Sequence, residues 1–210
     1  MKTGERRADV TGAILAGGEG KRMGRVNKAL LEVGGEPILG RLARTLGGLF
    51  EHVLVVARDA EPFADTGLPV VTDRHPQRSS LTGIHAALFH AETPFVFVTA
   101  CDTPFLQPAL VRALLAELGP DVDLVAPIRE NGHYEPLCAL YSRAACLGPV
   151  EDLLRADQFQ IIRFFPRVRV RAVPVGDLRR ADPDLVSFAN ANTPDDLEAL
   201  RRLIPAPDHR

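Results

Sequence analysis

Long apolar runs and an excess of charge of either sign are both missing from this sequence of 210 residues. No hydrophobic stretch approaches the roughly 18 residues of a membrane-spanning helix. The apolar segment 10–16 is too short for a signal peptide and runs directly into glycines. The net charge of −2 lacks the basic excess of a dedicated nucleic-acid binder. We therefore expect a cytoplasmic protein that binds neither membranes nor nucleic acid.

Cysteine is scarce as well, with Cys101, Cys138 and Cys146 the only three, and no two have the spacing of a zinc or redox motif. Each has apolar neighbours, so we expect buried thiols in a reducing compartment. No linker, internal repeat or block of like charge divides the sequence. We expect a single domain over all 210 residues, with residues 1–8 and 205–210 frayed.

Short β-branched runs alternate with longer segments of helical period. The predicted strands are 10–15, 53–56, 70–71, 95–98, 124–127, 137–141 and 168–171, and the predicted helices start at Pro37, cover 81–91, 106–118 and 144–154, and resume after Asn192. This order predicts an α/β fold of three layers, with a mainly parallel, doubly wound (Rossmann-like) sheet between helices. Ligands bind such sheets at the carboxyl ends of the strands.

The first predicted strand ends in a glycine-rich segment, LAGGEGKRMG, over residues 15–24. Four glycines within eight residues let the backbone approach a ligand closely. The spacing fits neither a Walker A loop nor the dinucleotide-binding fingerprint. Backbone N–H groups interleaved with cations suit a triphosphate, because Arg22 can hold phosphate oxygens bidentately and Lys28 adds a compact charge. Solvated surface positions are the alternative for both cations.

A second candidate is Asp102, which follows the apolar strand 95–98 at the same expected edge of the sheet as the glycine-rich segment. Mg²⁺ prefers one or two carboxylates together with water and substrate phosphates. Asp102 is therefore a candidate magnesium ligand, and capping of the following helix is its alternative.

Taken together, the glycine-rich segment, Asn27-Lys28, the run CDTP at 101–104 and the run NANTP at 190–194 resemble the nucleotidyltransferases, most closely the molybdenum cofactor guanylyltransferases. The resemblance extends over nearly the whole chain. It implies a fold of the nucleotide-diphospho-sugar transferase type and the Mg²⁺-dependent transfer of GMP from GTP to the phosphate of a molybdopterin cofactor, with release of pyrophosphate. Cytidylyltransferase relatives usually have Ala-Ala-Gly where this chain has Ala16-Gly17-Gly18, which favours GTP over CTP.

The resemblance also implies roles for individual residues. Arg22, Lys28 and Asp102 are expected to be catalytic, with Mg²⁺ on Asp102. The expected nucleotide-binding residues are Leu15, Ala16, Gly17, Gly18, Lys28, Asp73 and Asp102, and those expected on the acceptor side are Gly83, His133, Asn190 and Asn192. A turn position is the alternative for Asp73, a helix cap for Asn192 and a solvated loop for His133.

Two segments leave their roles open. Ser79 and Ser80 stand where many relatives have Gly-Pro, although they can still present donors to a phosphate at a helix N-terminus. Six arginines lie between residues 163 and 180. They form either a charged edge strand that resists aggregation or a docking face for an anionic pterin phosphate or a partner enzyme.

A phosphate monoester is already an anion near neutral pH, so the predicted reaction needs no general base and depends on alignment and charge neutralisation. Three alternatives stay open: a molybdopterin cytidylyltransferase, a sugar-1-phosphate nucleotidyltransferase, and a non-catalytic carrier of nucleotide or pterin. The expected partners are GTP and a molybdopterin-type cofactor as substrates, together with proteins of molybdenum insertion and molybdoenzyme maturation.

Overall fold

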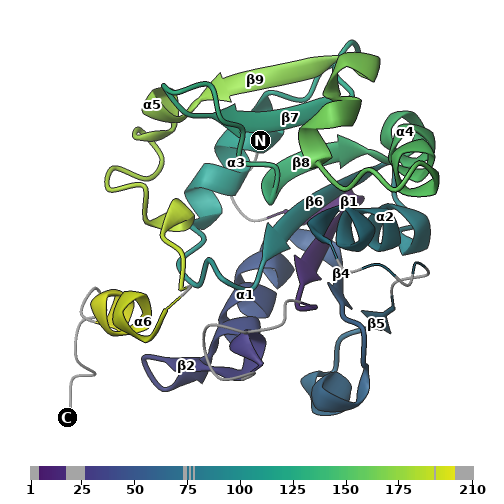
Figure 1. The fold of residues 1–210 in the computed structure, drawn as a ribbon. Helices are drawn as coiled ribbons and strands as arrows, with labels where there is room; N and C mark the ends of the chain where they lie inside the picture. Colours follow the sequence, from purple (N-terminus) through teal and green to yellow (C-terminus); the bar gives the residue numbers. More distant parts are fainter. Residues whose placement is uncertain are drawn as a thin grey trace.

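The structure, a computed structural model, describes residues 5–17, 27–72, 75, 77, 79–191 and 193–201. A seven-stranded sheet of order β5-β4-β1-β6-β8-β7-β9 runs through it (Figure 1). Its strands are β1 (Arg7–Leu15), β4 (Phe50–Val56), β5 (Val70–Val71), β6 (Phe95–Ala100), β7 (Leu124–Ile128), β8 (Cys138–Ser142) and β9 (Val170–Pro174). The helices are α1 (Ile38–Gly47), α2 (Ser80–His90), α3 (Pro108–Ala116), α4 (Arg143–Arg155), α5 (Val175–Leu178) and α6 (Pro194–Arg201). Within the described ranges, no helix is long and apolar enough to cross a membrane.

The strand order reverses beside β1. From β1 the chain runs outward to β4 and β5, and α2 then returns it to β6 on the other side of β1; all these strands are parallel. The carboxyl ends of β1 and β6 therefore lie side by side, with Leu15 paired to Ala100 and the Cys101 N–H donating to the Leu15 carbonyl at 3.1 Å. Open α/β sheets bind ligands at such a reversal point.

The second half of the sheet is mixed. β8 runs antiparallel to both β6 and β7, whereas β7 and β9 are parallel. The prediction of a mainly parallel α/β sheet with helices on both faces is confirmed. Figure 1 shows α1 and α3 on one face of the sheet and α2 and α4 on the other.

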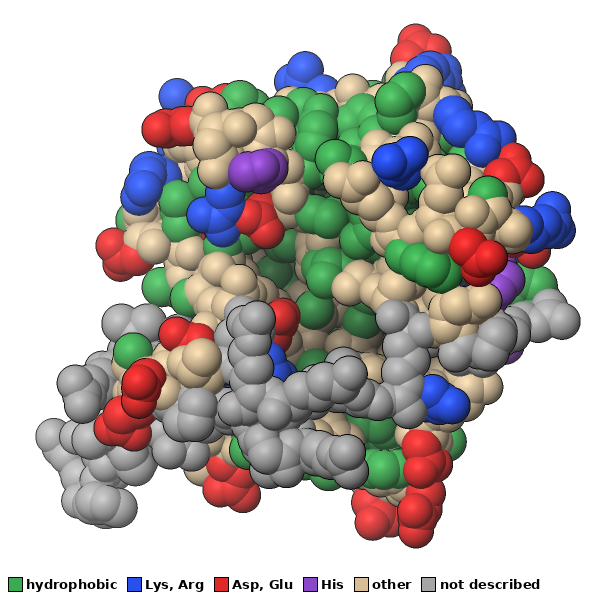
Figure 2. Space-filling view, in the orientation of Figure 1, with side chains coloured by type: hydrophobic (Ala, Val, Ile, Leu, Met, Phe, Trp, Pro, Cys, Tyr) green, Lys and Arg blue, Asp and Glu red, His purple; other side chains and the backbone are tan. Residues whose placement is uncertain are grey.

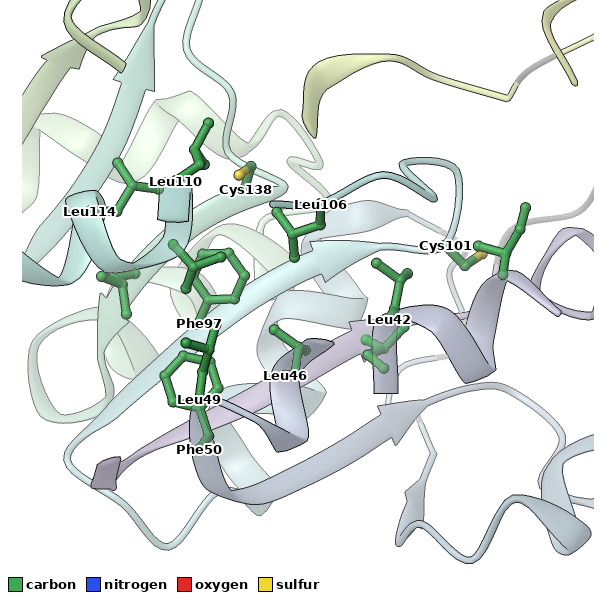
Figure 3. Packing of buried hydrophobic residues seen from close by; sticks show 14 of the residues in the cluster. Leu42, Leu46, Leu49, Phe50, Phe97, Cys101, Leu106, Leu110, Leu114 and Cys138 are labelled. Carbon is green, nitrogen blue, oxygen red and sulfur yellow. The ribbon is translucent and has the colours of Figure 1, made fainter. Parts of the chain in front are cut away.

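Alternate side chains of each strand enter two separate cores, one on each face of the sheet. Under α1, Leu46 lies beside Phe97 and Phe50 of the sheet (Figure 3), whose ring centroids are 6.0 Å apart. The helix and sheet meet closely here, because a Cβ on Gly12 of β1 would lie 2.9 Å from the Phe50 ring. This contact fixes β1, which carries the chain to the carboxyl edge of the sheet, against α1, which carries the chain away from that edge.

Several predicted boundaries are wrong by a few residues. The helix expected over 106–118 is α3, Pro108–Ala116, and the Gln107 N–H before it is bound by the Ser187 hydroxyl at 2.9 Å. The strand expected over 168–171 starts at Val170, because the Arg169 N–H donates to the Asp123 carboxylate at 2.9 Å rather than continuing the ladder.

The ends of two other elements also differ from prediction. β1 begins at Arg7, so the expectation of fraying is wrong for residues 7 and 8. Pro37 precedes α1 as its N-cap and closes a small hairpin of β2 (Glu32–Val33) and β3 (Glu36–Pro37) that the sequence analysis missed. The turn of this hairpin uses positive φ at Gly34 and Gly35, a conformation that favours glycine.

Candidate active site

Asp102 stands just beyond the end of β6, at the point where the strand order reverses. The hydroxyl of Thr103 donates to the Ala100 carbonyl at 2.9 Å and closes this turn. The Asp102 carbonyl accepts a hydrogen bond from the Ala191 N–H at 2.7 Å, which ties the turn to a segment nearly ninety residues later in the chain. The backbone around Asp102 is therefore held from two sides.

The environment of the Asp102 carboxyl is partly desolvated and charged. Burial raises the pKa of this carboxyl above its usual range, the positive charge of Lys28 opposes that rise, and Glu135 adds to it. Only the ionised carboxylate can hold a cation, and burial makes that ionised form unfavourable when no cation is bound. A cation placed beside Asp102 would relieve that cost.

Lys28 comes to the same edge from the other side of β1. It opens a short 3-10 turn, Lys28–Leu30, whose cap is the Asn27 side chain accepting the Ala29 N–H at 3.2 Å. Lys28 is half-buried and lowers the pKa of both the Asp102 carboxyl and the Cys101 thiol. The charge of Lys28 therefore acts on Asp102 across the end of β1.

The described part of the glycine-rich segment is the end of β1. Leu15 and Ala16 are buried, and the Ala16 N–H donates to the Val56 carbonyl at 2.8 Å. Gly17 is exposed, and a Cβ there would meet only the Arg58 nitrogen, at 3.9 Å. The packing of the described protein does not demand glycine at position 17, whereas close approach of a ligand to the backbone would.

Four predicted site residues, Gly18, Arg22, Asp73 and Asn192, lie outside the described residues. Of the predicted acceptor-side residues, Asn190 is exposed and directly precedes Ala191, which is bound to the Asp102 turn. His133 is exposed in the loop between β7 and β8. Asn190 is thus the acceptor-side candidate whose neighbour in the chain is hydrogen-bonded to the Asp102 turn.

Gly83, predicted on the acceptor side, lies in a helix that packs against the end of β1. It is buried in the first turn of α2, and a Cβ there would lie 3.1 Å from Leu15 Cδ1. The turn before it is closed by a capping box, in which the Ser79 hydroxyl accepts the Thr82 N–H at 3.1 Å. Gly83 therefore acts on the site by letting α2 pack against the end of β1, and the Ser79 oxygen already caps its own helix.

Glu135 is a further charged residue beside Asp102, one that was not among the predicted catalytic, nucleotide-binding or acceptor-side residues. The antiparallel pairing of β6 and β8 puts Cys138, the first residue of β8, beside Thr99 near the carboxyl end of β6, and the charge of Glu135, three residues earlier, acts on Asp102. Glu135 also forms an ion pair with Arg129. The missing signal was the direction of β8, because only an antiparallel strand brings the residue before its start to the carboxyl end of β6.

Figure 2 shows the molecule hollowed near its centre, with hydrophobic side chains in the hollow and acidic, basic and histidine side chains around it. No group of three or more His, Cys, Asp or Glu side chains that could hold a metal occurs among the residues that the structure describes. A magnesium site needs no such group, since Mg²⁺ is bound through one or two carboxylates plus phosphates and water. The hard oxygen donor of Asp102 fits this kind of site.

The three cysteines are not part of the chemistry. Cys101, Cys138 and Cys146 are free and buried, which confirms the predicted buried thiols. Burial raises the pKa of Cys101 and of Cys146 to about 12 and raises that of Cys138 as well. Thiols with such pKa values are poor nucleophiles near neutral pH.

The arginines around β9 are paired within the chain. Arg167 binds Asp152 at 2.7 Å, Arg169 binds Asp123 at 2.8 Å, and Arg171 makes a further ion pair at 2.7 Å. This arrangement favours a charged sheet edge over a docking face for an anionic ligand.

Comparisons with known proteins agree with this geometry. Residues 12–169 match the model of the MobA-like NTP transferase domain family. A "Molybdenum cofactor guanylyltransferase" of Desulfosudis oleivorans is 38% identical over 94% of this chain and 96% of its own. A "Probable molybdenum cofactor guanylyltransferase" of Pelotomaculum thermopropionicum is 41% identical over 91% of both chains.

Solved structures show the same arrangement. The structure of molybdopterin-guanine dinucleotide biosynthesis protein A from Archaeoglobus fulgidus superposes with a TM-score of 0.79 at 29% identity, covering 92% of this chain and 97% of that one. A 4-diphosphocytidyl-2C-methyl-D-erythritol synthase from Anaerococcus prevotii shares the fold, with a TM-score of 0.69 at 14% identity over 93% of this chain and 96% of that one. With its family model matched over most of its length and its reversal point built as above, this chain belongs to the MobA-like NTP transferase family.

Proposed function

We propose that this protein transfers GMP from GTP to the phosphate of a molybdopterin cofactor and releases pyrophosphate. Relatives that share 38% and 41% of their residues with it carry the name of this activity. The observation that carries the proposal is that the charge of Lys28 acts on Asp102 at the reversal point of the sheet, where the Cys101 N–H joins the ends of β6 and β1. A cation for phosphate and a carboxylate for a metal are the two charges that nucleotidyl transfer requires there.

On the nucleotide side, the exposed backbone of Gly17 gives the triphosphate room to approach. Lys28 offsets the charge of the phosphates as a compact cation. The proposed roles of Gly18, Arg22 and Asp73 on this side rest on the resemblance of the sequence. Together these groups would hold the α-phosphorus near the carboxyl ends of β1 and β6.

We also propose Mg²⁺ as the resident metal, with Asp102 as its protein ligand. When bound, Mg²⁺ supplies neutralisation of the charge that develops on the phosphate oxygens. The fit rests on the hard carboxylate oxygen and on the burial that disfavours its negative charge. The turn that carries Asp102 is held by Thr103 and Ala191, so the carboxylate needs little rearrangement to take up its position.

In the reaction, an oxygen of the acceptor's phosphate monoester attacks the α-phosphorus of GTP. The new bond to phosphorus forms as the bond to the oxygen bridging toward the β-phosphate breaks, and the electron pair leaves with pyrophosphate. The attacking group is already an anion, so no side chain needs to remove a proton. The contribution of Lys28 and Asp102 is alignment and charge balance.

The test measures pyrophosphate release by the purified protein with Mg²⁺ and GTP, CTP, ATP or UTP, each with and without molybdopterin. We expect release only with GTP and molybdopterin together. Release with CTP would assign the protein to the cytidylyl alternative, and GTP binding with no release would support the carrier alternative. Proteins of molybdenum insertion and molybdoenzyme maturation are the proposed recipients of the product.

A further inference from the structure

Arg129 is an exposed arginine held rigidly beside the candidate active site. It follows the end of β7 and forms an ion pair through Nε with the carboxylate of Glu135. Its guanidinium carbon also lies 5.8 Å from the centre of the Phe188 ring, within the range of a cation–π contact. Two contacts from different parts of the chain therefore orient one cation.

Both anchors of Arg129 border Asp102. Glu135 lies just before β8, whose first residue pairs with Thr99 near the end of β6, and its charge acts on Asp102. Phe188 ends the short turn Val186–Phe188, and three residues later the Ala191 N–H binds the Asp102 carbonyl at 2.7 Å. Arg129 thus bridges the two segments that flank the catalytic carboxylate on the side away from β1.

The side of Asp102 away from β1 needs a further cation if an anionic acceptor is to bind there. Lys28 approaches from the β1 side, where the triphosphate is proposed to bind. The acceptor must bring its own phosphate dianion to a region that already holds Asp102 and Glu135. The Arg129 side chain is 44% exposed, and its pair with Glu135 uses one of five N–H donors. The other donors form the fork that recognises phosphate bidentately.

We propose that Arg129 binds the phosphate of the molybdopterin-type acceptor, with Glu135 and Phe188 acting as positioning residues for its guanidinium. This inference rests on the proposed function and adds to it a residue for the acceptor. It assigns opposite sides of Asp102 to the two substrates, with Lys28 on the nucleotide side and Arg129 on the acceptor side.

The test compares steady-state kinetics of wild type, Arg129→Ala, Arg129→Lys and Glu135→Gln. A charge-assisted bidentate contact is worth roughly 10- to 100-fold in affinity, so Arg129→Ala should raise the KM for molybdopterin by about that factor and leave the KM for GTP unchanged. Arg129→Lys should recover part of the loss, because it keeps the charge without the fork. Glu135→Gln should raise the same KM to a smaller extent, because it loosens the guanidinium without removing it.

Arg171→Ala is the matched control, since Arg171 is also an exposed, ion-paired arginine but lies on β9. Retention of molybdopterin by each protein on ultrafiltration gives a second readout that needs no turnover, and circular dichroism checks the fold. An unchanged molybdopterin KM and retention in Arg129→Ala would overturn the inference, as would an equal rise in the KM for GTP. Absence of transfer by wild type with intact, Arg129-dependent retention would overturn the proposed function alone.

Discussion

Asp182 offers a test of how the late segment of the chain is held against the active site. This carboxylate is only 3% exposed and accepts the N–H groups of Val186 at 3.1 Å and of Ser187 at 2.9 Å. Asp182→Ala would leave both donors without an acceptor. An unsatisfied buried donor costs about 1–3 kcal/mol, so for the two donors the free energy of unfolding should fall by about 2–6 kcal/mol. For a chain of this size that corresponds to a Tm lower by roughly 4–24 °C.

The effect should extend to the reaction. The segment that Asp182 caps leads to Ala191, which holds the backbone of Asp102. At a temperature where the variant is still folded, we expect kcat to fall while the KM for GTP stays close to that of wild type.

Urea unfolding followed by circular dichroism and by tyrosine fluorescence gives the stability, and pyrophosphate release gives kcat. Asp184→Ala is the control, because Asp184 is an exposed carboxylate in the same segment. If the free energies of unfolding of Asp182→Ala and Asp184→Ala differ by less than about 0.5 kcal/mol, the proposed role of Asp182 as a buried cap is refuted.

Two further predictions concern stability. A methyl group on Gly12 would lie 2.9 Å from the Phe50 ring, so Gly12→Ala should lower the free energy of unfolding, measured in urea, by about 1–3 kcal/mol. The control is Gly47→Ala in α1, where a Cβ meets nothing within 4 Å. This control should be neutral or stabilising by up to about 1 kcal/mol. A similar loss in both variants would contradict this packing account. Arg169 lowers the pKa of Asp123 from 3.8 to about 2. A carboxyl group whose pKa is lower in the folded protein than in the unfolded chain stabilises the fold at pH values above its unfolded-state pKa. This stabilisation is lost as the pH falls through its folded-state pKa. Arg169→Ala should therefore be less stable than wild type above about pH 4, with the difference disappearing toward pH 2 and shrinking in high salt because the pair is exposed. A difference in urea midpoint between wild type and Arg169→Ala that stays constant from pH 2 to 5 would contradict a stabilising Arg169–Asp123 ion pair.

Periodicity and the order of elements were sufficient to predict the parallel half of the sheet. The apolar run at Val53–Val56 and the helix face of Ile38, Leu42 and Leu46 are strong local signals, and the observed elements include them. Because ligands bind at the carboxyl ends of parallel strands, this half also sufficed to place Lys28 and Asp102 at one edge.

The remaining parts depended on contacts between distant residues. The direction of β8 cannot be read from its own side chains. Without that direction, the sequence does not reveal that the charge of Glu135 acts on Asp102. The same holds for Asp182, whose partners lie in a turn without apolar periodicity. Gly83 was assigned to the acceptor by resemblance, whereas its packing against Leu15 becomes visible only when α2 and β1 are placed together.

We propose that the reaction occurs at the edge of the sheet that holds Asp102. The most direct test of this proposal is pyrophosphate release from GTP and molybdopterin by Asp102→Ala, with Asp65→Ala, an exposed carboxylate in the segment Glu61–Thr66, as the control. Because burial raises the pKa of Asp102, the charged carboxylate does not stabilise the protein alone, so the variant should keep the Tm of wild type or exceed it. We predict that turnover falls by at least about 100-fold while Asp65→Ala retains wild-type turnover. Turnover close to that of wild type in a folded Asp102→Ala protein would contradict the account.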